Sequence, residues 1–227
     1  RSQNQTRLEQ TLTSHTDWGE AINVSIFYGR AVELDRLEQW IIGDRDRHHC
    51  SLVAVLGIGG IGKTALSVKL AKHIYNEFDY VIWRSLRNAK PLQEHLAEII
   101  QFLSDRREIK LPENLEDRIA LLIDYFRQYR CLVVLDNFET VLQTGSITGQ
   151  YRQGYEDYGQ LLQHVGEISH QSCLVITSRE KPKEVEVLQG EILPVRTLTL
   201  QGLNSLEGRR ILNAKGLGSS MDEATAL

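Results

Sequence analysis

The sequence predicts a three-layer α/β fold, in which a parallel five-stranded sheet is covered by helices on both faces. The first observation is a set of five short apolar runs, at residues 51–56, 80–83, 131–135, 173–177 and 192–200. The second is that these runs are continuously apolar, which is typical of strands buried on both faces. The third is that segments with helical periodicity lie between them, and alternation of strands and helices favours a parallel sheet.

Each predicted helix rests on apolar residues spaced three and four positions apart. This spacing places them on one face of a helix, and Gly43 ends the first such segment. The predicted helices are residues 31–42, 64–76, 92–103, 115–129 and 155–165. The polar residues 1–21 are interpreted as a linker or a weak helix. The Gly/Thr/Gln-rich stretch 141–154 is long for a loop in a compact domain, which indicates a functional or mobile segment.

The composition is that of an ordinary soluble globular domain. Of 227 residues, 41% are apolar and 25% charged, and the net charge of 26 − 30 = −4 carries no basic surplus for nucleic acid. No apolar run is long enough to cross a membrane. Two of the three cysteines begin apolar runs and are interpreted as core residues of a reducing compartment, so we expect a cytoplasmic protein.

A glycine-rich segment, Gly57-Ile58-Gly59-Gly60-Ile61-Gly62-Lys63-Thr64, follows the first apolar run and matches the P-loop pattern GxxxxGK[ST]. Its backbone N–H groups and the following helix N-terminus would surround the phosphates of ATP or ADP. Lys63 would reach the β- and γ-phosphates, and the Thr64 hydroxyl would bind Mg²⁺. The alternative is a glycine-rich turn with a surface lysine. The predicted nucleotide-binding residues of this segment are Gly57, Gly59, Gly60, Ile61, Gly62, Lys63, Thr64 and Ala65.

Two further predicted strands end in polar residues that suit the same chemistry. Asp136 follows the run 131–135, as expected of a Walker B carboxylate that binds Mg²⁺ together with Thr64. Glu139 is a candidate for polarising the attacking water, and Arg179 for contacting the γ-phosphate. The alternatives are a turn aspartate, an exposed loop carboxylate and a surface arginine.

Together these residues resemble the NB-ARC branch of the STAND signal-transduction ATPases, and therefore a P-loop NTPase fold. The resemblance covers residues 24–212 and is carried by the P-loop and by Phe27-Tyr28-Gly29-Arg30 with Glu33, Phe78–Trp83, Leu132–Asn137 and Leu174–Arg179. It implies that Tyr28 and Arg30 contact the adenine and ribose. The overall style also resembles cyanobacterial multidomain proteins in which this module precedes WD40 repeats.

The resemblance implies an ATP/ADP-binding switch with slow Mg²⁺-dependent hydrolysis, in which Arg179 and residues 141–154 sense the γ-phosphate. Asn137 departs from the second acidic residue that family members often carry, and an amide cannot serve as a general base. Implied partners are the nucleotide, C-terminal domains of the same polypeptide and a homo-oligomer induced by ligand. Two alternatives stay open: a phosphotransferase or nucleic-acid-stimulated ATPase, and a scaffold that holds nucleotide without hydrolysis.

The expected domain organisation places one nucleotide-binding domain at residues 24–212. Residues 1–23 are assigned to a linker or extension, and residues 213–227 to the start of a further segment. The family's downstream helical and winged-helix segments do not occur before Leu227, and the chain begins without Met. We therefore expect this sequence to be a piece of a longer protein.

Overall fold

A computed structural model describes residues 15–25, 27–43, 50–105, 107, 110–145, 149–203 and 205–214. Its centre is a six-stranded, fully parallel sheet with the strand order β1-β3-β4-β5-β2-β6. The strands are β1 (His15–Asp17), β2 (Leu52–Leu56), β3 (Tyr80–Ser85), β4 (Cys131–Asp136), β5 (Cys173–Ser178) and β6 (Val195–Thr199). The sequence predicts this α/β class and parallel sheet correctly.

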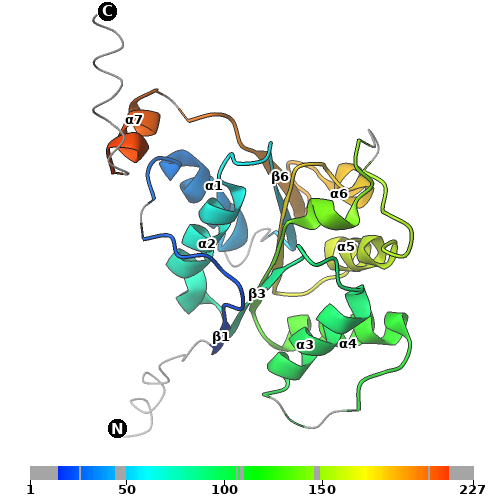
Figure 1. Ribbon diagram of the computed structural model, residues 1–227. Coiled ribbons are helices and arrows are strands. Elements are labelled where there is room, and N and C mark those ends of the chain that lie inside the picture. The colour runs from blue at the N-terminus through cyan, green and yellow to red at the C-terminus, as the bar shows by residue number, and fades with distance from the viewer. Residues whose placement is uncertain are drawn as a thin grey trace, which may run out of the picture.

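Helices cover both faces of the sheet, as Figure 1 shows. The covering helices are α1 (Ala31–Ile41), α2 (Lys63–Ile74), α3 (Leu92–Leu103), α4 (Leu115–Gln128), α5 (Asp157–Glu167) and α6 (Lys183–Leu188). A further helix, α7 (Ser205–Ala214), contributes no buried residue to either core. Two short 3-10 helices, η1 (Tyr75–Glu77) and η2 (Phe138–Val141), follow α2 and β4. None of the described helices is both long and apolar enough to span a bilayer.

Two hydrophobic cores form because alternate residues of each strand point to opposite faces of the sheet. Leu52, Ala54 and Leu56 of β2 belong to the core beneath α3, α4 and α5. Val53 and Val55 belong to the core beneath α1 and α2. Strands β2, β4 and β5 are therefore buried on both sides, which explains why their sequences are mostly apolar.

The number of strands differs from the prediction, because β1 lies in the segment interpreted as a linker or weak helix. Residues His15–Asp17 pair in parallel with Tyr80–Ile82 at the edge of the sheet. Their polar sequence carries no apolar run, since an edge strand needs backbone hydrogen bonds more than a buried face. Residues 1–14 and residues 215–227 of the expected C-terminal segment lie outside the described residues. The domain boundaries stay a prediction.

The carboxyl ends of the parallel strands meet at one edge of the sheet, where the loops enter the helices. β5 pairs with both β2 and β4, and β3 pairs with β4. The residues after β2, β4 and β5 are therefore neighbours although they lie far apart in the chain. This edge is where ligands bind in open α/β sheets.

Candidate functional site

The loop between β2 and α2 curves because three of its glycines have positive φ. The values are 151° at Gly57, 78° at Gly60 and 102° at Gly62. Side chains at Gly60 and Gly62 would meet no atom within 4 Å, so backbone conformation, and not space, requires glycine there. Because α2 begins at Lys63, the loop amides and the helix N-terminus lie together, as in an anion-binding loop.

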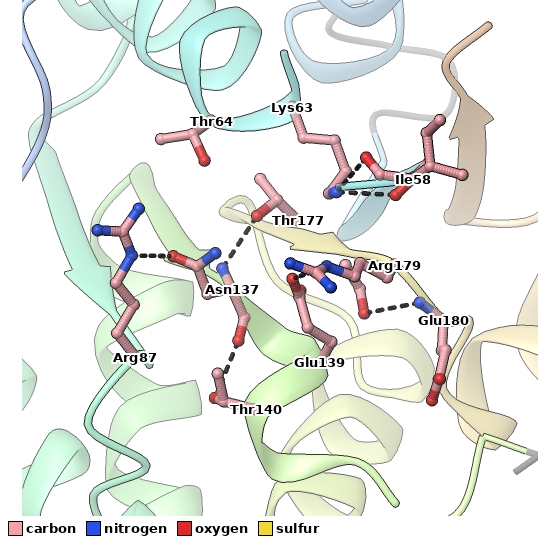
Figure 2. A network of polar contacts seen from close by, with 12 residues as sticks. Ile58, Lys63, Thr64, Arg87, Asn137, Glu139, Thr140, Thr177, Arg179 and Glu180 are labelled. Carbon is pink, nitrogen blue, oxygen red and sulfur yellow. Dashed lines mark hydrogen bonds and ion pairs between the residues drawn. The ribbon is translucent and has the colours of Figure 1, made fainter. Parts of the chain in front are cut away.

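The buried side chain of Lys63 folds back over this loop. Its Nζ donates hydrogen bonds to the carbonyl oxygens of Gly57 at 2.8 Å and Ile58 at 3.2 Å. Figure 2 shows the contact with Ile58. Burial lowers the pKa of Lys63, and the carboxylates of Glu139 and Asp136 act in the opposite direction. The ammonium group is thus held where it can exchange loop carbonyls for the oxygens of an anionic ligand.

A chain of hydroxyl and carboxylate oxygens joins α2 to the ends of β4 and β5. Thr64 Oγ1 donates to the Asp136 carboxylate and lies 2.8 Å from Asp136 Oδ1 and 3.1 Å from Asp136 Oδ2. Thr177 Oγ1 donates to Asp136 Oδ1 from the other side, at 2.6 Å. Asp136 and Thr177 are buried. Oxygen donors of this kind are the ligands that Mg²⁺ prefers, so the residues present fit the predicted metal.

Asn137 is fixed by its backbone and by its side chain. Its φ of 64° is left-handed, a conformation that asparagine tolerates better than most residues. Its N–H donates to Thr177 Oγ1 at 3.0 Å, and its Oδ1 accepts from Arg87 Nε at 3.1 Å (Figure 2). The amide side chain therefore points toward the loop after β3.

Arg179 and Glu139 form an ion pair beside the P-loop. Arg179 Nε lies 3.2 Å from Glu139 Oε1, and the Arg179 side chain is 62% exposed while that of Glu139 is 16% exposed. Glu139 Oε2 is buried and has no hydrogen-bond partner. A Cβ at Gly59 would lie 3.1 Å from Arg179 Cζ, so the absence of a side chain at Gly59 lets the guanidinium approach the loop.

The two residues that the family resemblance assigns to the adenine and ribose differ in burial. Arg30 is buried at the start of α1, where it donates to the carbonyl oxygens of Ile61 at 3.3 Å and Gln201 at 2.6 Å. It also pairs with Glu33 at 2.7 Å. Arg30 thus holds the P-loop to the segment after β6. Tyr28 is 38% exposed, and its predicted nucleotide contact stays a prediction.

The structure brings five predicted residues to one edge of the sheet, because they lie at or after the carboxyl ends of β2, β4 and β5. They are Lys63, Thr64, Asp136, Glu139 and Arg179. Sequence reasoning assigns no role to Thr177 or Arg87. Thr177 directly precedes Ser178-Arg179 at a strand end, a position that could have identified it, whereas Arg87 carries no comparable signal.

The long stretch 141–154 is anchored at its ends. Leu142 and Tyr151 form an antiparallel bridge, and the Tyr151 hydroxyl donates to Glu184 Oε2 at 2.6 Å. Leu142 and Tyr151 are both buried. Residues 146–148 lie outside the described residues, and the proposed sensing of the γ-phosphate by this stretch stays a prediction.

A family model and a known protein sequence both match this chain. The model of the NB-ARC domain matches residues 30–150, which include the P-loop and the end of β4. An uncharacterized WD repeat-containing protein of Nostoc sp. is 52% identical over 221 residues. This match covers 92% of the present chain but only 17% of the relative, so most of the relative's length has no counterpart here.

Comparison with solved structures finds the same fold at low identity. Cdc6p from Pyrobaculum aerophilum has a TM-score of 0.54 and 16% identity, covering 86% of this chain and 51% of that one. The Aeropyrum pernix ORC1 protein in complex with DNA has a TM-score of 0.54 and 17% identity, covering 84% and 50%. Drosophila ORC bound to DNA has a TM-score of 0.53 and 18% identity, covering 82% and 46%. These similarities support the P-loop NTPase fold.

Proposed function

Because the chain belongs to the NB-ARC family, we propose that it is an ATP/ADP-binding switch domain that hydrolyses ATP slowly with Mg²⁺. The observation that carries this proposal is the meeting of Lys63, Thr64 and Asp136 at the mouth of a P-loop. This place offers a positive charge, backbone amides and oxygen ligands for a divalent cation. These are the groups that bind the phosphates and the Mg²⁺ of a nucleoside triphosphate.

Each residue has a defined task in the proposed mechanism. The amides of residues 57–62 and the ammonium of Lys63 bind and orient the phosphates. Asp136 and Thr64 would hold Mg²⁺, which would neutralise charge on the β- and γ-phosphates. Thr177 keeps the Asp136 carboxylate turned toward Thr64 by its hydrogen bond.

Glu139 is the carboxylate proposed to orient the attacking water. Its ion pair with Arg179 engages one carboxylate oxygen, so a γ-phosphate that attracts Arg179 would release Glu139 at the same time. Asn137 directly after Asp136 cannot accept a proton as a general base. We therefore expect turnover to be slow, as suits a switch whose nucleotide state must persist.

The output of the switch is proposed to lie in other parts of a longer polypeptide. The relative from Nostoc is named as a WD repeat-containing protein, and this chain spans only 17% of it. We propose that nucleotide state sets the orientation of C-terminal domains, WD repeats among them, or the assembly of a homo-oligomer. A ligand can shift such an equilibrium only through different contacts in the two states.

Calorimetric titration with ATP and ADP, in Mg²⁺ and in EDTA, tests the proposal. We expect saturable binding that Lys63→Ala reduces at least a hundredfold, because the substitution removes a charged contact with the phosphates. Lys69→Ala is the matched control, since Lys69 is an exposed lysine of the same helix. Absence of saturable binding by the native chain would refute the proposed function.

A scaffold that retains ATP without cleaving it is the second candidate. The neutral Asn137 and the engagement of Glu139 by Arg179 favour it. A single-turnover assay with stoichiometric ATP separates the two. A switch releases phosphate over the course of the assay, whereas a scaffold still holds intact ATP when the protein remains folded.

A further inference from the structure

A pocket of about 670 Å³ opens at the carboxyl edge of the sheet, next to the proposed nucleotide site. Three arginines line it, Arg87 after β3, Arg152 before α5 and Arg179 after β5, together with Glu139. Residues 57–64 of the P-loop do not line it. The pocket therefore borders the nucleotide site and shares Glu139 and Arg179 with it, but it is built without the P-loop.

The pocket carries more positive than negative charge. Its one lining carboxylate, Glu139, is already paired with Arg179 at 3.2 Å. Within the part of the chain that the structure describes, neither Arg87 nor Arg152 forms an ion pair with a carboxylate. Two guanidinium charges at one concave surface are thus left without a counter-charge, although the chain as a whole is acidic.

Neutral groups orient both of these arginines. Asn137 Oδ1 accepts from Arg87 Nε at 3.1 Å, and the Thr140 carbonyl oxygen accepts from Arg152 Nη1 at 2.8 Å. Arg152 also lies over the Tyr155 ring, with Cζ 5.2 Å from its centroid. A guanidinium has five N–H donors, so each arginine is held in place while most of its donors stay available. This combination favours bidentate binding of an oxyanion.

We propose that this pocket is a second oxyanion site, in which Arg87 and Arg152 bind a phosphate group that does not belong to the bound nucleotide. Two uncompensated guanidinium groups suit the double charge of a phosphate better than the single charge of a carboxylate. The phosphate can come from inorganic phosphate or from a phosphorylated small molecule. Only the idea that it is the hydrolysis product rests on the proposed function.

Arg179 connects this site to the P-loop. It lines the pocket, pairs with Glu139 and lies against Gly59 of the loop. An anion in the pocket would compete with Glu139 for the Arg179 guanidinium. Phosphate in the second site would therefore alter the position of the same arginine that is proposed to sense the γ-phosphate.

The charge of the pocket explains why position 137 carries an amide and not a carboxylate. A carboxylate at this position would form an ion pair with Arg87 and neutralise it, whereas the amide orients Arg87 without cancelling its charge. The departure from the acidic residue common in the family is thus coupled to the charge of the pocket. Asn137→Asp is expected to weaken phosphate binding, and unchanged phosphate affinity in that variant would contradict the charge argument.

Titration of inorganic phosphate into the chain saturated with Mg²⁺-ADP, followed by ³¹P NMR or calorimetry, tests the site. We expect Arg87→Gln and Arg152→Gln each to weaken phosphate binding about tenfold, the value of one charged hydrogen-bonding contact. Arg36→Gln is the matched control, because Arg36 is an exposed arginine of α1 outside the pocket. Equal phosphate affinity in the native chain and both pocket variants would overturn the proposal.

Two further measurements distinguish the two sources of phosphate, and the second site from the proposed nucleotide switch. Tighter binding of inorganic phosphate than of a sugar phosphate supports a site for the hydrolysis product, and the reverse order supports an external phosphorylated ligand. In Lys63→Ala, phosphate binding to the pocket is expected to persist after nucleotide binding is lost. A chain that binds phosphate in the pocket but no nucleotide refutes the switch alone, and one that binds nucleotide but no phosphate refutes the second site alone.

Discussion

Thr177 Oγ1 donates a 2.6 Å hydrogen bond to Asp136 Oδ1 and accepts one of 3.0 Å from the N–H of Asn137. One buried hydroxyl thereby satisfies two groups at the end of β4. It also restricts the rotation of the Asp136 carboxylate, whose two oxygens lie 2.8 and 3.1 Å from Thr64 Oγ1. Thr177 is accordingly a positioning residue for the proposed Mg²⁺ ligand.

Replacement of this hydroxyl by a methyl group tests that role. Thr177→Val preserves the shape of the side chain but removes one of the two donors to Asp136 Oδ1 and leaves the N–H of Asn137 without its acceptor. We expect a loss of about 1–3 kcal/mol in the free energy of unfolding, measured in urea. We also expect the ratio of nucleotide affinities in Mg²⁺ and in EDTA to fall about tenfold, because a misdirected carboxylate binds the cation less well.

Thr177→Ser is the matched control, since it retains a hydroxyl. It should preserve the Mg²⁺ dependence of nucleotide binding even if the loss of a methyl group lowers stability. A Thr177→Val variant that is destabilised but keeps the native Mg²⁺ dependence would show that the residue is structural and does not position Asp136.

The difference between Lys63 and Thr177 shows how far sequence can predict this site. Lys63 and Thr64 are recognisable because they end a glycine-rich segment that follows an apolar run. Asp136 is recognisable because it is a carboxylate directly after another apolar run. The bonds from Thr177 to Asp136 depend on β5 lying next to β4, which is a property of the sheet order. Spatial neighbours of this kind are set by long-range pairing and carry no local signature.

The same reasoning applies to the fold. The buried strands β2, β4 and β5 are predictable because burial on both faces demands a continuously apolar sequence. Strand β1 is polar and is held by backbone pairing at an edge, so no hydrophobic pattern reveals it. Arg87 and Arg152 likewise occur in loops where arginine is common, and only the folded chain brings them into one pocket.

Substitutions at Glu139 and Asn137 should change the rate of ATP hydrolysis in opposite directions. Glu139→Gln keeps the size of the side chain but removes the carboxylate, and we expect phosphate release to slow at least a hundredfold. Asn137→Asp adds a carboxylate directly after Asp136, and we expect faster release. Single-turnover measurement of phosphate release, with nucleotide binding measured in parallel, gives both results.

Glu156→Gln is a control for Glu139→Gln, because Glu156 is an exposed glutamate outside the site. Nucleotide binding by Glu139→Gln should stay within a few-fold of the native value, since Glu139 is not among the proposed phosphate ligands. Unchanged phosphate release in Glu139→Gln would remove this residue from the mechanism and favour the scaffold if the native chain also retains intact ATP.

His95 should make stability depend on pH in the acidic range. It is buried in α3, neither ring nitrogen has a hydrogen-bond partner, and burial lowers its pKa from 6.5 to about 4. Glu98 opposes this shift, whereas Lys90 and Arg84 add to it. Between these pKa values the unfolded chain binds a proton that the folded chain does not, so stability falls as pH decreases from 6.5 toward 4.

We expect His95 to contribute a loss of about 2 kcal/mol between pH 7 and pH 5. Urea unfolding of His95→Leu across this range should show a shallower fall, without loss of stability at pH 7, because leucine leaves no unpaired nitrogen. His73→Gln, a change at a histidine whose side chain is 63% exposed, should keep the native slope. A native slope in His95→Leu would contradict the assignment.

Asp17 should hold β1 to the sheet through Arg84. Arg84 Nη2 lies 2.7 Å from Asp17 Oδ2, and the Arg84 side chain is only 12% exposed. Backbone pairing adds few further bonds, such as that from His15 N–H to the Asp79 carbonyl oxygen at 2.8 Å. In Asp17→Asn the ion pair is lost, and we expect amides of β1 to exchange hydrogen about fivefold faster, equivalent to about 1 kcal/mol of local opening. Glu20→Gln removes an exposed carboxylate from the same segment and should leave exchange unchanged, so equal rates in the two variants would show that backbone pairing alone retains β1.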